Sequence, residues 1–168
     1  DNTLRVYSGS TGALLYALPP PPGGHIFVAV ADLGDWNNDG RADLAVVTYY
    51  NGNNLVRLVQ GQNGGTLATS ASIANNNAAC TLRRVGDVNQ DGRGDLAICN
   101  LSSATVLQTS PMVVRYTTPA NVPYRELRVA DLDGNGVAEL LLHRNTPAGT
   151  GTSGQIEEWL SQGKLDVA

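Results

Sequence analysis

Aromatic residues, histidine and cysteine are all scarce in this 168-residue chain. Aromatic residues make up 5% of the chain, and it has two histidines and two cysteines. His25 and His143 are far apart in the repeat pattern described below, so neither a zinc site nor a histidine-based catalytic triad is supported. No apolar run approaches the roughly 18 residues of a transmembrane helix, and we therefore expect no membrane span.

Hydrophobic residues nevertheless make up 42% of the chain, most of them Val, Leu, Ala and Ile. That share is enough for a packed core and argues against general disorder. The 19 glycines, together with many Asn, Ser and Thr, are typical of short strands joined by frequent turns. The composition therefore predicts an all-β protein, and we expect no long helix.

The acidic residues are concentrated in three short loops. The formal net charge of −4 is modest and argues against nucleic acid as the main partner. Carboxylates crowded into one loop repel one another and raise each other's pKa unless a cation lies among them. Nine of the 15 acidic residues belong to these loops: Asp35, Asp39, Asp43, Asp87, Asp91, Asp95, Asp131, Asp133 and Glu139.

The sequence repeats internally. The segment 4–12 resembles 56–64, and the segment 34–45 resembles 86–97, both at a separation of 52 residues. A looser copy at 130–141 follows 44 residues after the second. Residues 112–116 are predicted to be its upstream strand, and a fourth copy begins at 155–163.

Each repeat is predicted to contain four short strands, as a blade of a β-propeller does. In the first repeat these strands are Leu4–Tyr7, Leu14–Leu18, Ile26–Ala31 and Asp43–Tyr49. We expect a single repeat domain over 1–168, with units at 1–52, 53–108 and 109–154, and with 155–168 starting a further unit or completing a blade.

The three acidic loops share the pattern D-x-[DN]-x-[DN]-G-x-x-[DE], which predicts calcium binding. Calcium prefers six to eight oxygen ligands, and a tight loop offers side-chain oxygens at positions 1, 3, 5 and 9 and a carbonyl at position 7. Glycine at position 6 permits the sharp turn. The alternative is that these are metal-free turns. The predicted ligands are Asp35, Asn37, Asp39, Arg41, Asp43; Asp87, Asn89, Asp91, Arg93, Asp95; and Asp131, Asp133, Asn135, Val137, Glu139, with Arg41, Arg93 and Val137 acting through their carbonyls.

The loops differ from an EF-hand. That motif has a glutamate at position 12 and flanking helices. Position 12 is here Val46, Ile98 or Leu142, each inside an apolar run. We therefore expect a strand, rather than a helix, to leave each loop.

The G-D-x-N-x-D-G-x-x-D-L-A block, combined with the V-R-V-x-S-G-x-x-G hairpin, resembles the FG-GAP or VCBS repeats. These repeats build the β-propeller of integrin α-subunits and of many bacterial secreted proteins. The resemblance covers nearly the whole chain and implies a mainly structural calcium ion in each repeat, about three per chain. The third unit departs from the pattern at Asp133, Asn135 and Glu139. A closed ring in this family has about seven blades, so further blades or a homo-oligomer are implied.

Cys80 and Cys99 are the two cysteines. The register expected for the hairpin around the second loop places them opposite each other, which predicts a cross-strand disulfide. Two buried free thiols are the alternative. Calcium binding and a disulfide both favour an extracellular, secreted or cell-surface location.

The tripeptide Arg93-Gly94-Asp95 spells the RGD adhesion motif. Recognition by an integrin would require a free Asp95 carboxylate, whereas Asp95 is already position 9 of the second loop. We interpret the motif as a coincidence within a metal loop.

The sequence thus predicts a non-enzymatic, calcium-binding module that serves adhesion, ligand binding or a scaffold, with a protein or glycan as partner. Two alternatives are open at this stage. The first is a lectin-type propeller that binds carbohydrate, and the second is an accessory domain of a larger secreted enzyme.

Overall fold

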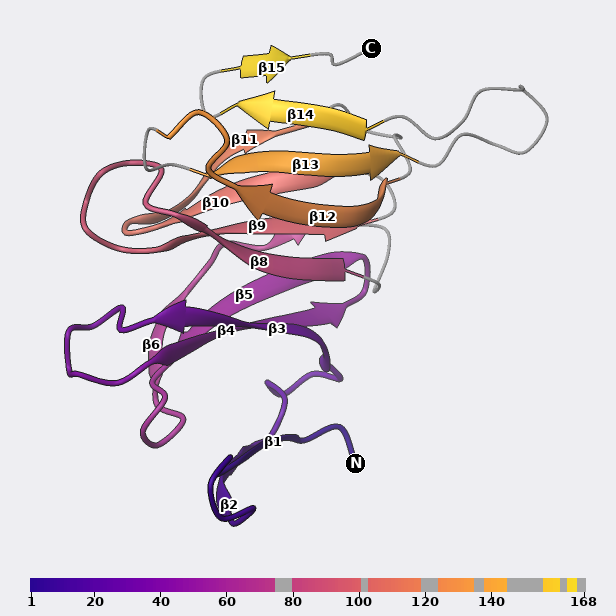
Figure 1. The fold of residues 1–168 in the computed structure, drawn as a ribbon. Coiled ribbons are helices and arrows are strands. Elements are labelled where there is room, and N and C mark those ends of the chain that lie inside the picture. The colour runs from indigo at the N-terminus through magenta and orange to yellow at the C-terminus, as the bar shows by residue number, and fades with distance from the viewer. Residues whose placement is uncertain are drawn as a thin grey trace. The chain divides into compact units, whose positions relative to one another are not determined.

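The computed structural model of the chain describes residues 1–74, 80–100, 103–118, 124–134, 138–144, 156–160 and 163–165. Within these ranges all regular elements are β-strands, as predicted, and all strand pairs are antiparallel (Figure 1). No helix in this part of the chain is long and apolar enough to cross a membrane. The chain divides into two compact units, residues 1–78 and 79–168.

The first unit contains two sheets. One is the hairpin of β1 (Leu4–Tyr7) and β2 (Leu14–Leu18), whose bounds are those predicted. The other has the order β3-β4-β5-β6, formed by β3 (Ile26–Gly34), β4 (Asp43–Tyr50), β5 (Asn53–Val59) and β6 (Thr66–Thr69). The short strand β7 (Ile73–Ala74) pairs with β5.

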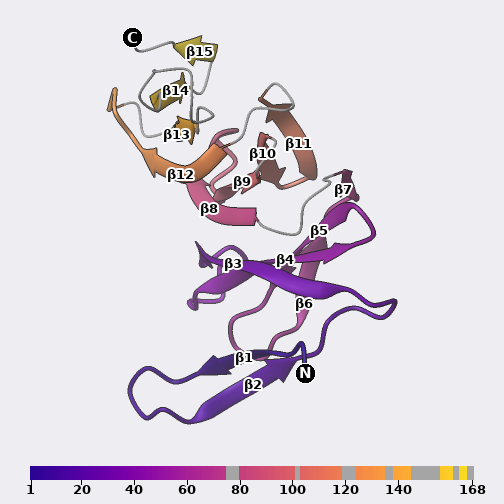
Figure 2. The same ribbon diagram turned by 90° about the vertical axis from the view of Figure 1, so that its right-hand side faces the viewer.

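The second unit contains two sheets of four strands, with the orders β11-β10-β9-β8 and β12-β13-β14-β15. In Figure 2 the strands β12 to β15 lie beside β8 to β11. The strands are β8 (Cys80–Gly86), β9 (Asp95–Asn100), β10 (Ala104–Thr109), β11 (Met112–Thr117), β12 (Tyr124–Ala130), β13 (Glu139–Arg144), β14 (Ile156–Leu160) and β15 (Gly163–Leu165).

These sheets group the strands differently from the expected units. The predicted boundary between 52 and 53 falls between β4 and β5 of one sheet, and that between 108 and 109 falls within β10. Each of the three larger sheets instead begins with the strand that precedes an acidic loop. The segment 112–116, predicted as the first strand of the third unit, is β11, an edge strand of the second sheet.

The central strands form the core because both of their faces are covered. Ala45, Val46 and Val47 are consecutive in β4 and have no exposed surface, as expected of a strand that reads as a continuous apolar run. In the first unit, Leu18 of β2 packs with Val46 and Val59, so the β1–β2 hairpin covers one face of the β3–β6 sheet.

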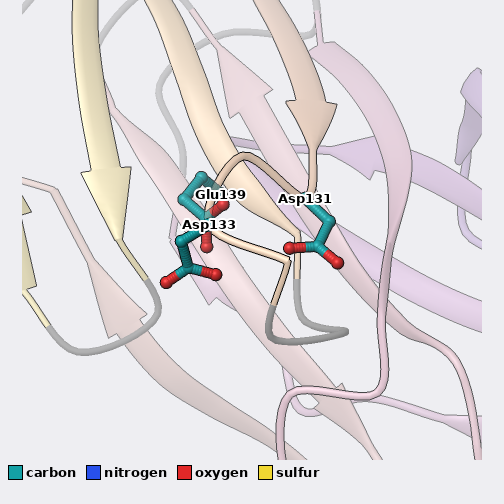
Figure 3. A group of neighbouring side chains, drawn as sticks. All are labelled: Asp131, Asp133 and Glu139. Atoms are coloured by element: carbon teal, nitrogen blue, oxygen red, sulfur yellow. The ribbon is translucent and has the colours of Figure 1, made fainter.

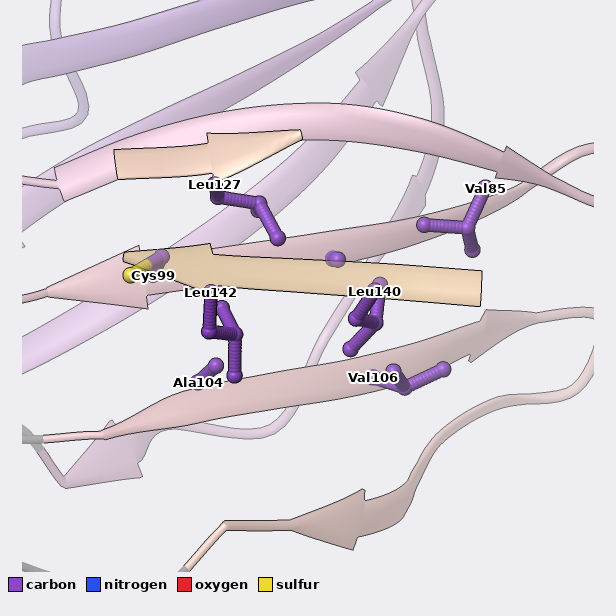
Figure 4. Packing of buried hydrophobic residues seen from close by; sticks show 8 residues of the cluster. Val85, Cys99, Ala104, Val106, Leu127, Leu140 and Leu142 are labelled. Carbon is purple, nitrogen blue, oxygen red and sulfur yellow. The ribbon is translucent and has the colours of Figure 1, made fainter. Parts of the chain in front are cut away.

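In the second unit, leucines of β12 and β13 pack onto the face of β8, β9 and β10 (Figure 4). The buried cluster is apolar throughout and joins the two sheets of this unit. Its members are Val85, Ala97, Cys99, Ala104, Val106, Leu127, Leu140 and Leu142.

Strands β6 and β11 are each followed by a buried hydroxyl residue that completes the ladder. The Val56 N–H donates to Ser70 Oγ at 3.0 Å, and the Ser70 N–H donates to the Val56 carbonyl at 2.8 Å. Thr118 makes the same reciprocal pair with Ala104, both bonds being 2.8 Å. The two sheets therefore share this detail although Ser70 and Thr118 differ in type.

Ser70→Ala is expected to lower the free energy of unfolding by about 1–3 kcal/mol, because it leaves the buried Val56 N–H without an acceptor. Thr118→Val should behave alike through Ala104. Urea denaturation measures both, with the exposed Ser10→Ala as control. Equal stability of Ser70→Ala and Ser10→Ala would contradict the assignment.

Candidate metal centres

The three acidic loops occupy equivalent places in the three larger sheets. Each loop joins the first strand of its sheet to the second: β3 to β4, β8 to β9, and β12 to β13. The carboxylate at position 9 is in each case the first residue of the second strand, namely Asp43, Asp95 or Glu139. A strand leaves each loop, as predicted.

The closing carboxylate is fully buried in every loop. Asp43, Asp95 and Glu139 all have 0% exposed surface. Each accepts a hydrogen bond from the N–H at loop position 2, at 3.1 Å, 2.9 Å and 2.7 Å respectively. The carboxylate therefore connects the start of the loop to the strand that leaves it.

The carboxylate at position 1 organises the rest of the first two loops. Asp35 accepts the N–H of Asp39 at 2.9 Å on Oδ1 and the N–H of Gly40 at 2.8 Å on Oδ2. Asp87 accepts the corresponding bonds from Asp91 and Gly92 at 3.0 Å and 2.6 Å. A carboxylate oxygen has two lone pairs, so these bonds leave room for a cation on the same oxygens.

The backbone conformation also repeats. Position 4 is left-handed in all three loops, with φ of 60° at Asn38, 60° at Gln90 and 75° at Gly134. Glycine at position 6 has φ of 83° in the first loop and 85° in the second, which confirms its predicted role in the turn.

The third loop is where carboxylates gather most closely (Figure 3). One oxygen from each of Asp131, Asp133 and Glu139 lies within 4.8 Å of the others. Among the residues that the structure describes, no second group of three carboxylates is this close. Two of the three are exposed, whereas Glu139 is buried and its Oε1 has no hydrogen-bond partner.

This group could bind a metal ion. Three carboxylates within reach of one cation, one of them with a buried oxygen that nothing satisfies, fit the hard oxygen ligands that such an ion requires. The other predicted ligands of this loop, Asn135 and Val137, lie outside the described residues.

The second loop has an unsatisfied oxygen of its own. The amide nitrogen of Asn89 donates to Asp91 Oδ2 at 2.9 Å and to the Ser110 carbonyl at 3.2 Å. Asn89 Oδ1 is buried and has no partner. This is the predicted ligand atom at position 3.

In the first loop the position-3 amide is engaged at both ends. Asn37 Nδ2 donates to Asp39 Oδ2 at 3.0 Å, and Asn37 Oδ1 accepts the Asp39 N–H at 3.0 Å. At position 7 the N–H groups of Arg41 and Arg93 donate to the position-5 carboxylates at 3.0 Å and 2.9 Å. Ligation through their carbonyls stays a prediction.

Burial and hydrogen bonding shift the pKa values of two loop carboxylates in opposite directions. Desolvation raises the pKa of Asp95, although hydrogen bonds from Thr109 and Val88 oppose the shift. The side-chain hydrogen bond from Gln60, followed by that from Asn37, lowers the pKa of Asp39. The charged form is therefore disfavoured at the buried end of the second loop and favoured in the exposed first loop.

The Arg93-Gly94-Asp95 tripeptide is built into the second loop. Asp95 is buried and its two oxygens accept the N–H groups of Val88 and Thr109. A buried carboxylate bonded in this way cannot reach the metal of a partner protein, which agrees with our interpretation of the motif as coincidental.

The register of the β8–β9 pair differs by one residue from the one we expected. Cys99 is opposite Thr81, and Cys80 is opposite Asn100. The expected register was therefore wrong by one residue, whereas the disulfide stays a prediction, because the Cys80 side chain lies outside what the structure describes.

Sequence reasoning did not identify residues of the following hairpin that contact the loops. Gly61 donates its N–H to Asp43 Oδ1 at 3.0 Å, and Thr109 donates its N–H to Asp95 Oδ1 at 2.8 Å. Gln60 donates its side-chain amide to Asp39. The repeated Gly9 and Gly61 were visible in the alignment, but nothing in it pointed to a loop contact.

A protein-family model matches part of the chain. Residues 35–98, which include the first two loops and the hairpin between them, match the model of the FG-GAP-like repeat. No curated protein matches the chain. This match supports the predicted resemblance to the FG-GAP repeats for residues 35–98.

Proposed function

We propose that this chain is a calcium-binding β-propeller-type module in which calcium has a structural role in each loop. The module acts outside the cytoplasm, in adhesion, in ligand binding or as a scaffold, and its role is not catalytic. The FG-GAP-like repeat and the sheets of four strands support the module. The metal and its purpose are the parts that we propose.

The observation that carries the proposal is the unpartnered Oε1 of Glu139. This oxygen is fully buried beside two further carboxylates. A buried acceptor without a partner costs about 1–3 kcal/mol, and more when it is charged. Two neighbouring negative charges add repulsion, so a cation at this place would remove both penalties at once.

Calcium fits this set better than other common metals. The available ligands are carboxylate, amide and backbone oxygens, which suit hard cations rather than zinc or copper. Calcium accepts irregular shells of six to eight oxygens, such as a turn can supply, whereas magnesium requires a near-ideal octahedron.

Calcium at the third loop would connect the strands on either side of it. Asp131 and Asp133 follow β12, whereas Glu139 begins β13. A bound ion would therefore tie the first two strands of the sheet together at their loop end. Extracellular calcium modules work at dissociation constants of about 10⁻⁴–10⁻³ M, which is why we place the module outside the cytoplasm.

Isothermal calorimetry on chelator-stripped protein tests the proposal. We expect about three calcium ions per chain, one for each acidic loop. Glu139→Gln keeps the size of the side chain but removes its charge, and should remove one ion or weaken one site at least about tenfold.

Asp1→Asn provides the control, because it removes one negative charge outside the loops, where Asp1 pairs with Arg5. It should titrate as the parent does. If the parent protein bound no calcium, the three loops would be metal-free turns. A Glu139→Gln variant that binds calcium as the parent does would show that the third loop is not a calcium site.

A further inference from the structure

The turn between β5 and β6, residues 60–65, lies against the first acidic loop. It is closed by two backbone hydrogen bonds, from the Gln60 N–H to the Gly65 carbonyl at 2.7 Å and from the Gly64 N–H to the Gln60 carbonyl at 2.9 Å. Its backbone approaches the loop so closely that a Cβ at Gly61 would lie 1.8 Å from the Ala42 carbonyl oxygen. The turn is therefore seated directly on the loop.

Two adjacent residues of this turn bind two different carboxylates of the loop. Gln60 Nε2 donates to Asp39 Oδ2 at 2.9 Å, and the Gly61 N–H donates to Asp43 Oδ1 at 3.0 Å. Asp39 is position 5 and Asp43 is position 9, so both are predicted metal ligands. The second of these bonds uses the backbone, whereas the first depends on the side chain of Gln60.

The second repeat keeps the hydrogen bond from a backbone N–H to the closing carboxylate, but its glutamine side chain bonds to a different acceptor. Thr109 replaces Gly61 and donates its N–H to Asp95 at 2.8 Å. Gln108 occupies the place of Gln60, but its Nε2 donates to the Ser110 carbonyl at 2.9 Å. The same residue type at the same repeat position thus contacts a loop carboxylate in the first repeat and a turn carbonyl in the second.

We infer that Gln60 is a positioning residue for the first metal loop, one that sets the calcium affinity of this loop and not that of the other two. The inference rests on the proposed function. Gln60 comes from a different hairpin, 21 residues along the chain from Asp39, and its amide fixes one oxygen of a carboxylate that is otherwise exposed.

A carboxylate that is already oriented loses less conformational freedom when it binds a cation. Hydrogen-bond partners behind a metal ligand typically change affinity by about 10–100-fold when they are removed. We expect an effect of that size at the first loop alone.

The chain contains a probe for this loop. Trp36 is at position 2, where the other loops have Val88 and Leu132. Terbium, a hard trivalent ion that replaces calcium at oxygen sites, emits when a nearby tryptophan transfers energy to it. In a Trp159→Phe background Trp36 is the remaining tryptophan. Terbium emission excited at the long-wavelength edge of tryptophan absorption, where the six tyrosines do not absorb, therefore reports occupancy of the first loop.

The test compares Gln60→Met with Gln108→Met in this background. Methionine keeps the length of the side chain and removes the amide in both variants. Gln60→Met should raise the terbium concentration at half-maximal emission about tenfold or more, whereas Gln108→Met should stay within about twofold. Calorimetry on Gln60→Met should still detect the sites of the second and third loops with unchanged affinity.

An affinity of Gln60→Met equal to that of the parent, or higher, would overturn the inference while leaving the proposed function intact. Equal weakening by the two variants would also overturn it, because the effect would not be specific to the loop contact. A parent protein without sensitised emission would instead refute calcium binding at the first loop, and Gln60 would have no site to position.

Discussion

Gly61→Ala is expected to destabilise the first unit by more than about 3 kcal/mol, the upper range for overpacked sites. The added Cβ would lie 1.8 Å from the Ala42 oxygen and 2.9 Å from the Ala42 carbonyl carbon. Both are backbone atoms, so no side-chain rotation relieves the clash. The turn must move away from the loop, and the Gly61 N–H then loses Asp43 as its acceptor.

Gly9→Ala is the matched control for this prediction. Gly9 holds the same place in the β1–β2 hairpin that Gly61 holds after β5, yet a Cβ there meets nothing within 4 Å. It should change the free energy of unfolding by no more than about 0.5 kcal/mol. Urea denaturation of the two variants decides the matter, and equal stabilities would show that the 60–65 turn is not seated on the loop.

The second repeat makes the equivalent contact through a different residue. Thr109 stands where Gly61 does, and its hydroxyl donates to the Gly94 carbonyl at 2.8 Å. Gly94 is the counterpart of Ala42. In the first repeat the backbone of Gly61 approaches the Ala42 carbonyl directly, whereas in the second the Thr109 hydroxyl bonds to the Gly94 carbonyl. A comparison of residue types alone does not reveal that these two contacts are equivalent.

The loops and their flanking strands could be predicted because their chemistry is local. An alternating set of carboxylates and amides with a glycine at position 6 specifies a turn by itself. Apolar runs on both sides then specify the strands, and β3 and β4 contain the predicted strands and extend beyond them by three residues and one residue. The predicted strands of the β1–β2 hairpin agree residue for residue.

The grouping of strands into sheets could not be obtained in the same way, because a repeat defines a period but not its starting point. Cutting the sequence at residue 1 places the β1–β2 hairpin first in its unit, whereas hydrogen bonding makes the equivalent β5 and β6 the last two strands of their sheet. The equivalent β10 was missed since Ser110 and Pro111 replace the glycine-rich turn that marks the other hairpins.

Register was the most sensitive prediction. In the pairing of β8 with β9, Cys80 is opposite Asn100 and Cys99 is opposite Thr81, one residue away from the expected register. Successive residues of a strand point to opposite faces, so a shift of one residue removes the argument for a direct cross-strand pair. The register also shifts at Gly86, where φ is 81°, and a similar shift occurs at the equivalent Gly34, so the repeated glycine before the first two loops marks this irregularity.

The three loops also differ in a way that their common pattern conceals. The third departs most from the pattern, yet its carboxylates are the ones that converge, with Glu139 reaching the group from within the core. In the first loop, Asn37 and Gln60 both donate to Asp39. Donors of this kind satisfy a carboxylate in part before any cation arrives, so we expect the third loop to depend on the metal most.

Calcium should stabilise the two units unequally, because they contain different numbers of acidic loops. A site filled at a hundred times its dissociation constant contributes about 2.7 kcal/mol to the free energy of unfolding. The first unit contains one acidic loop, whereas the second contains two. The expected gain is thus about 2.7 kcal/mol for residues 1–78 and about twice that for residues 79–168.

Hydrogen exchange followed by mass spectrometry can measure the two gains separately, since peptides from each unit report its own opening. Exchange of the buried amides of β4 should slow by about two powers of ten on adding calcium, and that of β9 and β13 by about four. In Glu139→Gln the gain of the second unit should fall to that of the first, because one of its two sites loses its buried carboxylate. Equal protection of both units in the parent, or no loss in the variant, would mean that the ion does not bind where Glu139 leaves its oxygen unsatisfied.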